Sequence, residues 1–281
     1  MIKKKIIICS IIKNESRNLN NLFNLIRKIS SFFLDYYVII VESDSLDKSY
    51  QLAKIKINNL KGRIIKVKTN KNWKRTKKIS FCRNIYLKII SNEKNLKKFD
   101  YVIVVDADKV NNKLNMIDLS NTIKFLPKNW IGFFPNQSLI YYDLYALRIK
   151  KFLEFDCFEK MISNLKFLSP RKSYFINVFK NFFIIREFKK RFIKVESAFG
   201  GMAFYKLKYI LKKKYSSNNG KSCEHVLFNK SLLKKNKFLY IDKKLINSYG
   251  LNDHFIKGII YSLSNFFSKK LINSLKSNYE N

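Results

Sequence analysis

The chain has 281 residues, enough for one large α/β domain or two small ones that share a core. Its hydrophobic content of 47%, with abundant Phe and Tyr, excludes a disordered protein. The formal net charge of +37 comes from Lys spread along the chain and not from an Arg-rich cluster, so nucleic-acid binding is a minor hypothesis. Phosphate-bearing ligands or an anionic membrane face suit this charge better.

The cysteines and the N-terminus bear on where the protein resides. The four cysteines are far apart without CxxC spacing, which favours free thiols in a reducing compartment over a structural zinc site. The opening run MIKKKIIICSII is too short to span a bilayer and lacks a small-residue cleavage site, so it predicts a strand. We therefore expect a cytoplasmic protein, loosely attached at the inner membrane face.

Strands alternate with helices in the first 110 residues. The predicted strands are Lys5–Ile12, Tyr36–Val41, Arg63–Lys68 and Tyr101–Val105. The first helix carries Leu19 to Ile29, the second has Leu52, Ile55 and Leu60 inward with Gly62 closing it, and the third runs from Lys74 to Ile90. This alternation indicates right-handed βαβ units in an α/β fold with a mostly parallel central sheet flanked by helices.

Two carboxylates, Asp106 and Asp108, follow the buried strand Tyr101–Val105 directly. Open α/β sheets bind ligands at the carboxyl ends of their strands, and two close acids repel unless a cation lies between them. Hard divalent cations prefer carboxylate oxygen, so the pair predicts a metal site. An Asp-rich turn that caps the next helix explains a lone DxD about equally well.

Acids also end the earlier strands. Glu15 follows the first strand, and Glu42 and Asp44 follow the second, where they can accept hydrogen bonds from base and ribose groups. Each is also an ordinary helix-entry residue. Neither GxGxxG nor GxxxxGK[ST] follows the first strand, so neither a dinucleotide site nor a P-loop is supported.

A basic helix leads into the strand that bears the acid pair. Arg75, Ile79 and Arg83 are spaced to share one helical face, which predicts phosphate pairing or, equally, a solvated basic face.

The second half is less regular. Trp130–Phe134 predicts a strand and Pro135–Gln137 a turn, and in YYDLYALR aromatic rings surround Asp143, which suits either a bound polar ring or core packing. Residues 152–192 show no clear periodicity and predict a mobile or insertion-like acceptor region.

Three further features of the second half bear on function. Gly200 and Gly201 form the chain's only Gly-Gly pair and imply close approach of the backbone to a strand or a ligand. Glu224 and His225 open a short helix, where Glu224 is also suited to pair with the helix dipole and His225 to a structural role. The segment from His254 to Leu275 predicts a helix that packs on the domain or rests on a membrane.

Together these segments resemble glycosyltransferases of the GT-A fold. IIICSIIKNE and VESDSLDKS resemble their nucleotide-binding opening, RTKKISFCRN their basic helix, and VVDADKV their DxD motif. YYDLYALR, AFGGMAFY and CEHVLFN are similar in type and order to segments of the capsule-associated α-1,3-mannosyltransferase family. The resemblance covers most of Lys4–Asn229. It implies one glycosyltransferase domain, with a nucleotide-binding half (1–110), an acceptor half (111–254) and a C-terminal basic helix (255–281).

The resemblance implies metal-dependent hexosyl transfer from a UDP- or GDP-linked sugar to a glycan or a lipid-linked acceptor, in polysaccharide or cell-envelope synthesis. Mn²⁺ or Mg²⁺ would be held by Asp108 and Asp106, with His225 or His254 completing the shell. The implied donor-binding residues are Glu15, Glu42, Asp44, Arg75, Arg83, Asp106, Gly200 and Gly201. Glu224 is the implied catalytic acid or base, with Asp143 as a second catalytic candidate.

Two other functional classes remain open. A metal-dependent nucleotidyltransferase also pairs acids with a divalent ion, but it predicts a Gly-rich phosphate loop that Ile6–Glu15 lacks. A non-catalytic basic protein that binds membrane or RNA would bind less tightly as salt rises and would not need Asp108.

Overall fold

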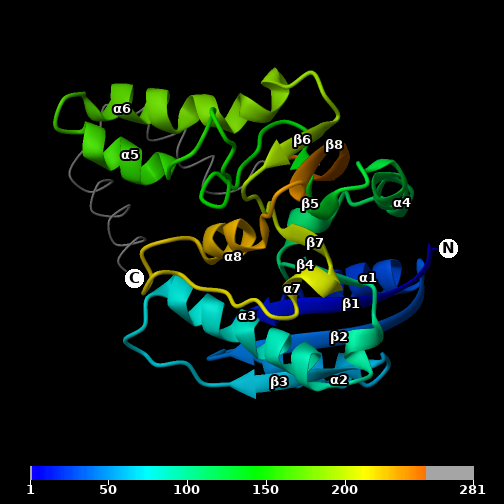
Figure 1. Cartoon of the computed structure of the whole chain (residues 1–281). Coiled ribbons are helices and arrows are strands. Elements are labelled where there is room, and N and C mark those ends of the chain that lie inside the picture. Colours follow the sequence, from blue (N-terminus) through cyan, green and yellow to red (C-terminus); the bar gives the residue numbers. More distant parts are fainter. Residues whose placement is uncertain (1, 251–281) are drawn as a thin grey trace.

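The computed structural model describes residues 2–250, in which eight strands form one sheet (Figure 1). Their order across the sheet is β3-β2-β1-β4-β7-β5-β8-β6. The strands are β1 (Ile2–Ile12), β2 (Phe33–Ser43), β3 (Gly62–Val67), β4 (Tyr101–Val105), β5 (Trp130–Gln137), β6 (Phe192–Val195), β7 (Met202–Lys206) and β8 (Phe238–Ser248). The predicted α/β class with a mostly parallel sheet is confirmed, since β1 pairs in parallel with β2 and β4, β2 with β3, and β5 with β8.

The helices cover both faces of the sheet. They are α1 (Leu19–Ser30), α2 (Ser49–Ile57), α3 (Arg75–Asn92), α4 (Met116–Phe125), α5 (Cys157–Asn164), α6 (Pro170–Asn177), α7 (Leu207–Ile210) and α8 (Glu224–Leu232), with short 3₁₀ helices η1 (Leu96–Lys98), η2 (Lys109–Asn111) and η3 (Phe179–Glu187). Successive side chains of a strand point to opposite faces, so β1 serves two cores. Ile6 and Ile8 pack with α1, while Ile7 and Cys9 pack with α3 and α8.

Two predicted details of the first half are wrong. Ile55 was expected to face inward, but its side chain is 66% exposed, and Ala53 and Ile57 fill the inner face of α2 instead. Gly62 was expected to end that helix, but it begins β3 and lies against Val38 of β2 so closely that an added Cβ would be 2.5 Å from the Val38 carbonyl oxygen. Strand packing therefore explains this glycine.

The predicted turn at Pro135–Gln137 is also wrong, because these residues complete β5. The pairing of β5 with β8 shifts register between Phe134 and Asn136, and Pro135 lies at this irregularity. A bulge is one of the few positions at which a sheet tolerates proline, since the ring removes a backbone donor.

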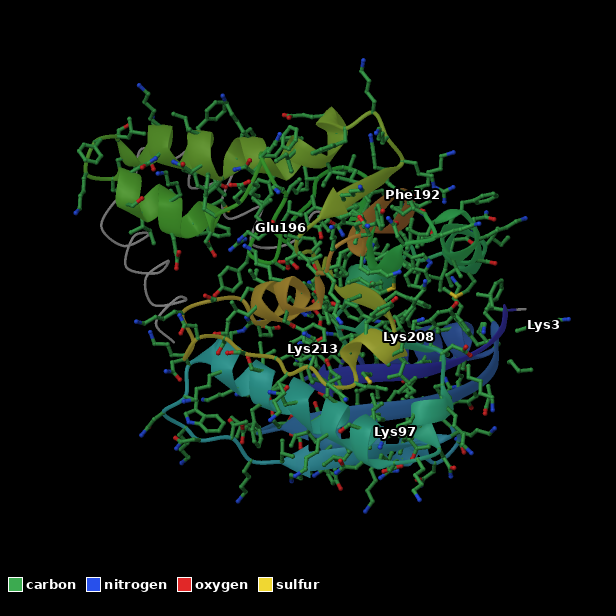
Figure 2. The ribbon with its side chains drawn as sticks, in the orientation of Figure 1. Lys3, Lys97, Phe192, Glu196, Lys208 and Lys213 are labelled. Atoms are coloured by element: carbon green, nitrogen blue, oxygen red, sulfur yellow. The ribbon has the colours of Figure 1, made fainter. Side chains whose placement is uncertain are left out.

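The segment 152–192 is largely helical, and α5 packs against α6 at the side of the molecule farthest from β3 (Figure 1). All four cysteines are buried and free, as expected. The basic charge is spread over separate elements: Lys3 on β1, Lys97 in η1 and Lys208 on α7 are all exposed (Figure 2). The predicted helix at 255–281 and His254 lie outside the described residues.

No helix in residues 2–250 has the length and apolar character that crossing a bilayer would require.

Candidate functional site

The DxD segment and the Gly-Gly turn meet at one edge of the sheet. β1, β2 and β4 are parallel, so their carboxyl ends share this edge, while β7 runs antiparallel to β4 and begins there. Asp106 follows β4 and Gly201 precedes β7, and the Asp106 amide donates to the Gly201 carbonyl at 3.0 Å. Two segments that are far apart in sequence are thus fixed side by side by strand pairing.

Arg83 lies at the centre of a charged cluster at this edge. It comes from α3, and its side chain is only 4% exposed, so the predicted solvated basic face does not include Arg83. Its Nε donates to Glu224 Oε1 at 3.1 Å, and its Nη2 lies 3.5 Å from Asp106 Oδ1. The rings of Phe199 and Tyr215 lie 5.0 and 5.7 Å from the guanidinium carbon. The helix α8 is thereby tied to the end of β4 through α3.

Several carboxylates surround Asp106. Desolvation raises the pKa of Asp106 to about 7, against the influence of Arg83, and Asp108, Asp143 and Glu224 raise it further. Asp108 is exposed, but neighbouring protein atoms partly desolvate its carboxylate and raise its pKa, although it accepts from the Val110 amide at 3.3 Å and caps η2. Both carboxyls would gain from a cation placed between them.

The carboxylate oxygens of Asp106 and Asp108 are suitable ligands for Mn²⁺ or Mg²⁺ bound together with phosphate. Within residues 2–250, no three His, Cys, Asp or Glu side chains are grouped to hold a metal by themselves. Mg²⁺ commonly takes one or two carboxylates and completes its shell with substrate phosphates and water. Asp106 and Asp108 supply two hard oxygen ligands of that kind, so these residues suit a metal that arrives with a diphosphate.

Asp143 is joined to the Gly-Gly turn. One carboxylate oxygen accepts from the Gly200 amide at 3.0 Å and the other from the Ala146 amide at 3.3 Å. Burial raises its pKa; the negative charge of Glu224 adds to this, and the positive charge of Arg75 opposes it. The structure therefore places Asp143 beside the Gly-Gly turn, where its charge acts on Asp106 and the charge of Glu224 acts on it, while Arg75, at the start of α3, is exposed.

Both glycines of the turn have positive φ, 61° at Gly200 and 83° at Gly201. A Cβ on Gly200 would lie 2.6 Å from Gln137 Nε2, and one on Gly201 would lie 2.1 Å from Val110 Cγ2. The predicted close backbone approach is thus made to side chains that surround the site, and only glycine fits both the space and the backbone conformation.

Gly201→Ala is expected to lower the free energy of unfolding by about 1–3 kcal/mol, because it adds left-handed strain and a clash with Val110. Chemical denaturation measures the change. Gly201→Ala with Val110→Ala relieves the clash but keeps the strain, so it should recover part of the loss, with Val110→Ala alone as the control. Equal stability of Gly201→Ala and the unchanged chain would contradict the left-handed, closely packed backbone of this turn.

The acids of the first two strands occupy different environments. Glu15 accepts from Asn18 Nδ2 at 2.8 Å, and burial raises its pKa, with Asp108 among the contributors. Glu42 is fully buried at the end of β2, and its Oε2 has no hydrogen-bond partner among the described residues. Asp44 accepts from the amide and the hydroxyl of Thr69, at 3.1 and 2.5 Å, which joins the ends of β2 and β3.

His225 is enclosed by aromatic rings. It stacks on Phe199 with ring centroids 3.8 Å apart and meets Tyr215 edge to face at 5.5 Å. Its Nε2 is 3.6 Å from Glu224 Oε1, and neither ring nitrogen has a hydrogen-bond partner among the described residues. Burial lowers its pKa well below the usual value, and Arg83 adds to this effect. The structure brings His225 beside Glu224 but does not group it with Asp106 and Asp108 as a third ligand.

Three amide side chains that hold the Gly-Gly turn were not predicted from the sequence. Asn247 Nδ2 donates to the Gly200 carbonyl at 2.7 Å, Gln137 Nε2 donates to Asn247 Oδ1 at 3.0 Å, and Asn111 Nδ2 donates to the Gly201 carbonyl at 2.9 Å. Gln137 and Asn247 lie near the carboxyl ends of β5 and β8. Polar residues at the ends of apolar strands were the available signal, but neither strand end was predicted.

The chain is similar to several solved structures. One is the mannosyltransferase PcManGT from Pyrobaculum calidifontis in complex with GDP-Man and Mn²⁺, at 9% identity over 100% of this chain and 70% of that chain, with a TM-score of 0.54. Another is S. aureus TarS 1–349 in complex with UDP, at 14% identity over 98% of this chain and 70% of that chain, with a TM-score of 0.49. A third is glucosyl-3-phosphoglycerate synthase from Mycobacterium tuberculosis with Mg²⁺ and UDP, at 9% identity over 92% of this chain and 78% of that chain, with a TM-score of 0.46.

No protein-family model and no curated protein matches the sequence. The similarity to the mannosyltransferase shows the fold, and this chain has the α/β architecture of GT-A glycosyltransferases.

Proposed function

We propose that this protein is a metal-dependent glycosyltransferase that moves a sugar from a UDP- or GDP-linked donor to an acceptor hydroxyl. One observation carries the proposal: Asp106, Arg83 and Glu224, from three distant segments, converge beside the Gly-Gly turn at the carboxyl edge of the sheet. Open α/β sheets bind their ligands at this edge. The Mn²⁺ and GDP-Man in the complex of the P. calidifontis enzyme support the same class of donor.

Asp106 and Asp108 would hold Mn²⁺ or Mg²⁺, with His254 as a further ligand; His225, enclosed by aromatic rings and not grouped with the two aspartates, is left out of this shell. When bound, the metal neutralises negative charge that develops on the leaving diphosphate. Glu15, Glu42 and Asp44, which follow or end β1 and β2, would accept from ribose and base groups. Glu42 is fully buried, so its unpaired Oε2 would reach a ligand only after its side chain turns outward. Arg75, which is exposed at the start of α3, is suited to pair with phosphate.

Glu224 is the proposed catalytic carboxylate, either as the base for the acceptor hydroxyl or as the group that steadies an oxocarbenium-like sugar. Its Oε1 accepts a hydrogen bond from Arg83, which fixes the side chain. Its Oε2 has only a long contact with Cys223 Sγ, at 4.0 Å. Asp143, held by two amides, is the second catalytic candidate. The backbone of Gly200 and Gly201 would lie against the donor sugar.

The finer assignments belong to the same proposal. They are hexosyl transfer of the capsule-associated α-1,3-mannosyltransferase type, a glycan or lipid-linked acceptor, and a role in polysaccharide or cell-envelope synthesis. They also include action in the cytoplasm with peripheral contact at the membrane, and one catalytic domain in which residues 1–110 bind the nucleotide and residues 111–254 the acceptor. The sequence segments that resemble that family support them.

A hydrolysis assay tests the proposal. A panel of UDP- and GDP-linked sugars is incubated with the protein and Mn²⁺, and released nucleoside diphosphate is measured. Release from one donor that stops with EDTA and returns with excess Mn²⁺ is the expected result. A protein that neither binds nor hydrolyses any member of the panel would contradict the proposal.

A further inference from the structure

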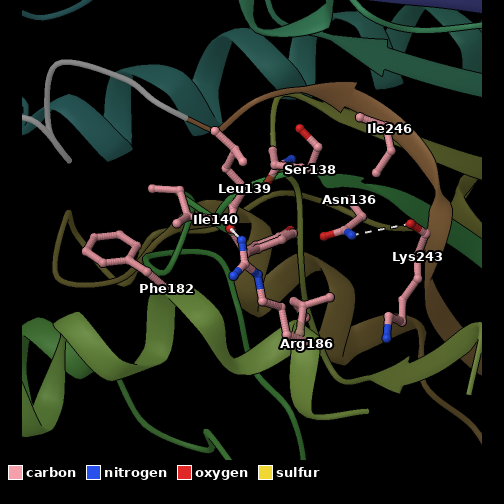
Figure 3. A pocket seen from close by; sticks show the side chains of 11 residues that line it. Asn136, Ser138, Leu139, Ile140, Phe182, Arg186, Lys243 and Ile246 are labelled. Atoms are coloured by element: carbon pink, nitrogen blue, oxygen red, sulfur yellow. Dashed lines mark hydrogen bonds between the residues drawn. The ribbon is translucent and has the colours of Figure 1, made fainter. Parts of the chain in front are cut away.

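A hollow lies at the carboxyl ends of β5 and β8. It is an open pocket of about 310 Å³ lined by the end of β5 and the loop after it, by η3 and by the second half of β8 (Figure 3). This volume is at the lower end of the ~300–1,000 Å³ that ligand sites usually occupy, so it suits one small ligand. None of the roles assigned above uses this cavity.

The lining offers a hydrogen-bond acceptor. Gln137 is a lining residue, but its Nε2 donates to the Gly200 carbonyl and to Asn247 and its Oε1 has no exposed surface, so its amide belongs to the Gly-Gly turn. Its neighbour Asn136 donates from Nδ2 to the Lys243 carbonyl at 3.3 Å, which leaves its Oδ1 to accept (Figure 3). An acceptor in the wall of a cavity is stabilised by a donor, so a hydroxyl group suits Asn136 Oδ1.

The lining is also positively charged. Arg186 of η3 and Lys243 of β8 contribute cations, and none of the described residues that line the cavity is acidic. Arg186 donates from Nη2 to the Leu139 carbonyl, and Lys243 donates from Nζ to the Phe188 carbonyl at 2.5 Å. Each cation therefore has a fixed position and retains further N–H groups for a ligand. Apolar side chains, among them Ile140 and Phe182, complete the wall.

The cavity shares a wall with the candidate site. Gln137 Nε2 approaches the Gly200 carbonyl at 3.4 Å, and the hydroxyl of Tyr141, another lining residue, accepts from the Phe199 amide at 3.3 Å. Gly200 in turn donates to Asp143. One layer of side chains thus separates the cavity from the Gly-Gly turn.

We infer that this cavity binds a sugar unit that carries a phosphate or a carboxylate. A hydroxyl of the sugar faces Asn136, and the anionic group faces Arg186 and Lys243. That the pocket binds such a sugar is inferred from its lining residues alone. That the bound sugar is the acceptor of the transfer reaction rests on the proposed function, because the shared wall at Gly200 would place the sugar beside the donor.

Ligand binding to the full chain tests the inference without nucleotide or metal. Isothermal titration calorimetry is carried out with glucose 6-phosphate and with glucuronic acid, and in separate arms with glucose and with inorganic phosphate. At least one of the two anionic sugars is expected to bind at least tenfold more tightly than either glucose or phosphate alone, and the arm that binds identifies the anionic group. Arg186→Gln is expected to weaken this binding at least tenfold, since it removes a charge-assisted contact. Arg27→Gln, at an exposed arginine of α1, is the matched control and should bind normally.

Failure of both anionic sugars, phosphate binding as tightly as the sugar phosphate, or normal binding by Arg186→Gln would each overturn the inference. Asp108→Ala separates this inference from the proposed function. It should retain the anionic sugar while losing metal-dependent nucleotide binding, and loss of the sugar as well would overturn a separate site. Nucleotide hydrolysis without sugar binding would leave the proposed function intact and remove the cavity from it.

Discussion

Replacing Glu224 with Gln is expected to lower the hydrolysis of the nucleotide-sugar donor by about 10²–10⁴-fold, the usual contribution of one positioned general base. Gln keeps the volume of the side chain and can still accept from Arg83 Nε, which now lies 3.1 Å from Glu224 Oε1. The fold and the position of α8 should therefore persist while the carboxylate charge is lost.

The decisive comparison is between turnover and nucleotide binding. If Glu224 acts only in catalysis, Glu224→Gln should bind GDP or UDP with Mn²⁺ with the same affinity as the unchanged chain. Glu196→Gln is the control, because Glu196 forms a more exposed pair with Lys230 of α8 at 3.3 Å (Figure 2). Normal turnover in Glu224→Gln would remove Glu224 from the catalytic residues and leave it the role of holding Arg83.

Replacing Arg83 with Met is expected to lower the free energy of unfolding by about 3–5 kcal/mol, because it leaves the buried Glu224 carboxylate without its counter-ion and weakens the support of Asp106, whose side chain is 31% exposed. Glu224 and Asp106 both face the guanidinium, at 3.1 and 3.5 Å, and the Glu224 side chain is only 6% exposed. Combining Arg83→Met with Glu224→Gln removes one of the stranded charges, so the double variant should be more stable than Arg83→Met alone.

Urea denaturation measures both variants. Arg63→Met provides the matched control, since Arg63 pairs with Glu93 at the end of the same helix α3 at 2.7 Å, but both side chains are at least 37% exposed. Exposed pairs contribute about 0–1 kcal/mol. A loss at Arg83 no larger than the loss at Arg63 would show that the buried cluster is not formed as described.

The first half of the fold could be predicted because its signals are local. Tyr101–Val105 was predicted with the bounds that the structure has, since an uninterrupted β-branched run bounded by acids is typical of a buried parallel strand. The position of Asp106 followed from that strand, because the end of a strand fixes which edge its next residue reaches. The burial of Arg83 could not be predicted, since helical spacing gives a face but does not say what packs on it.

The second half depends on contacts between distant residues. β5 pairs with β7 and β8, which lie roughly 70 to 110 residues further along the chain, and a local pattern carries no information about such pairing. The end of β5 was therefore expected as a turn, and the amides of Gln137 and Asn247 were not connected with the Gly-Gly turn. The pairing of Glu224 with Arg83 could not be predicted for the same reason, since the two residues are 141 positions apart.

Thermal unfolding with Mn²⁺ and GDP or UDP tests the central claim, that Asp106 and Asp108 hold a metal with a nucleoside diphosphate. At a ligand concentration 100 times the dissociation constant, the account predicts stabilisation of the unchanged chain by about 2.7 kcal/mol. The effect should disappear with EDTA and in Asp108→Ala, and should persist in Asp118→Ala, which changes a partly exposed acid in the first turn of α4. Equal stabilisation of Asp108→Ala and the unchanged chain, or none of either, would contradict it.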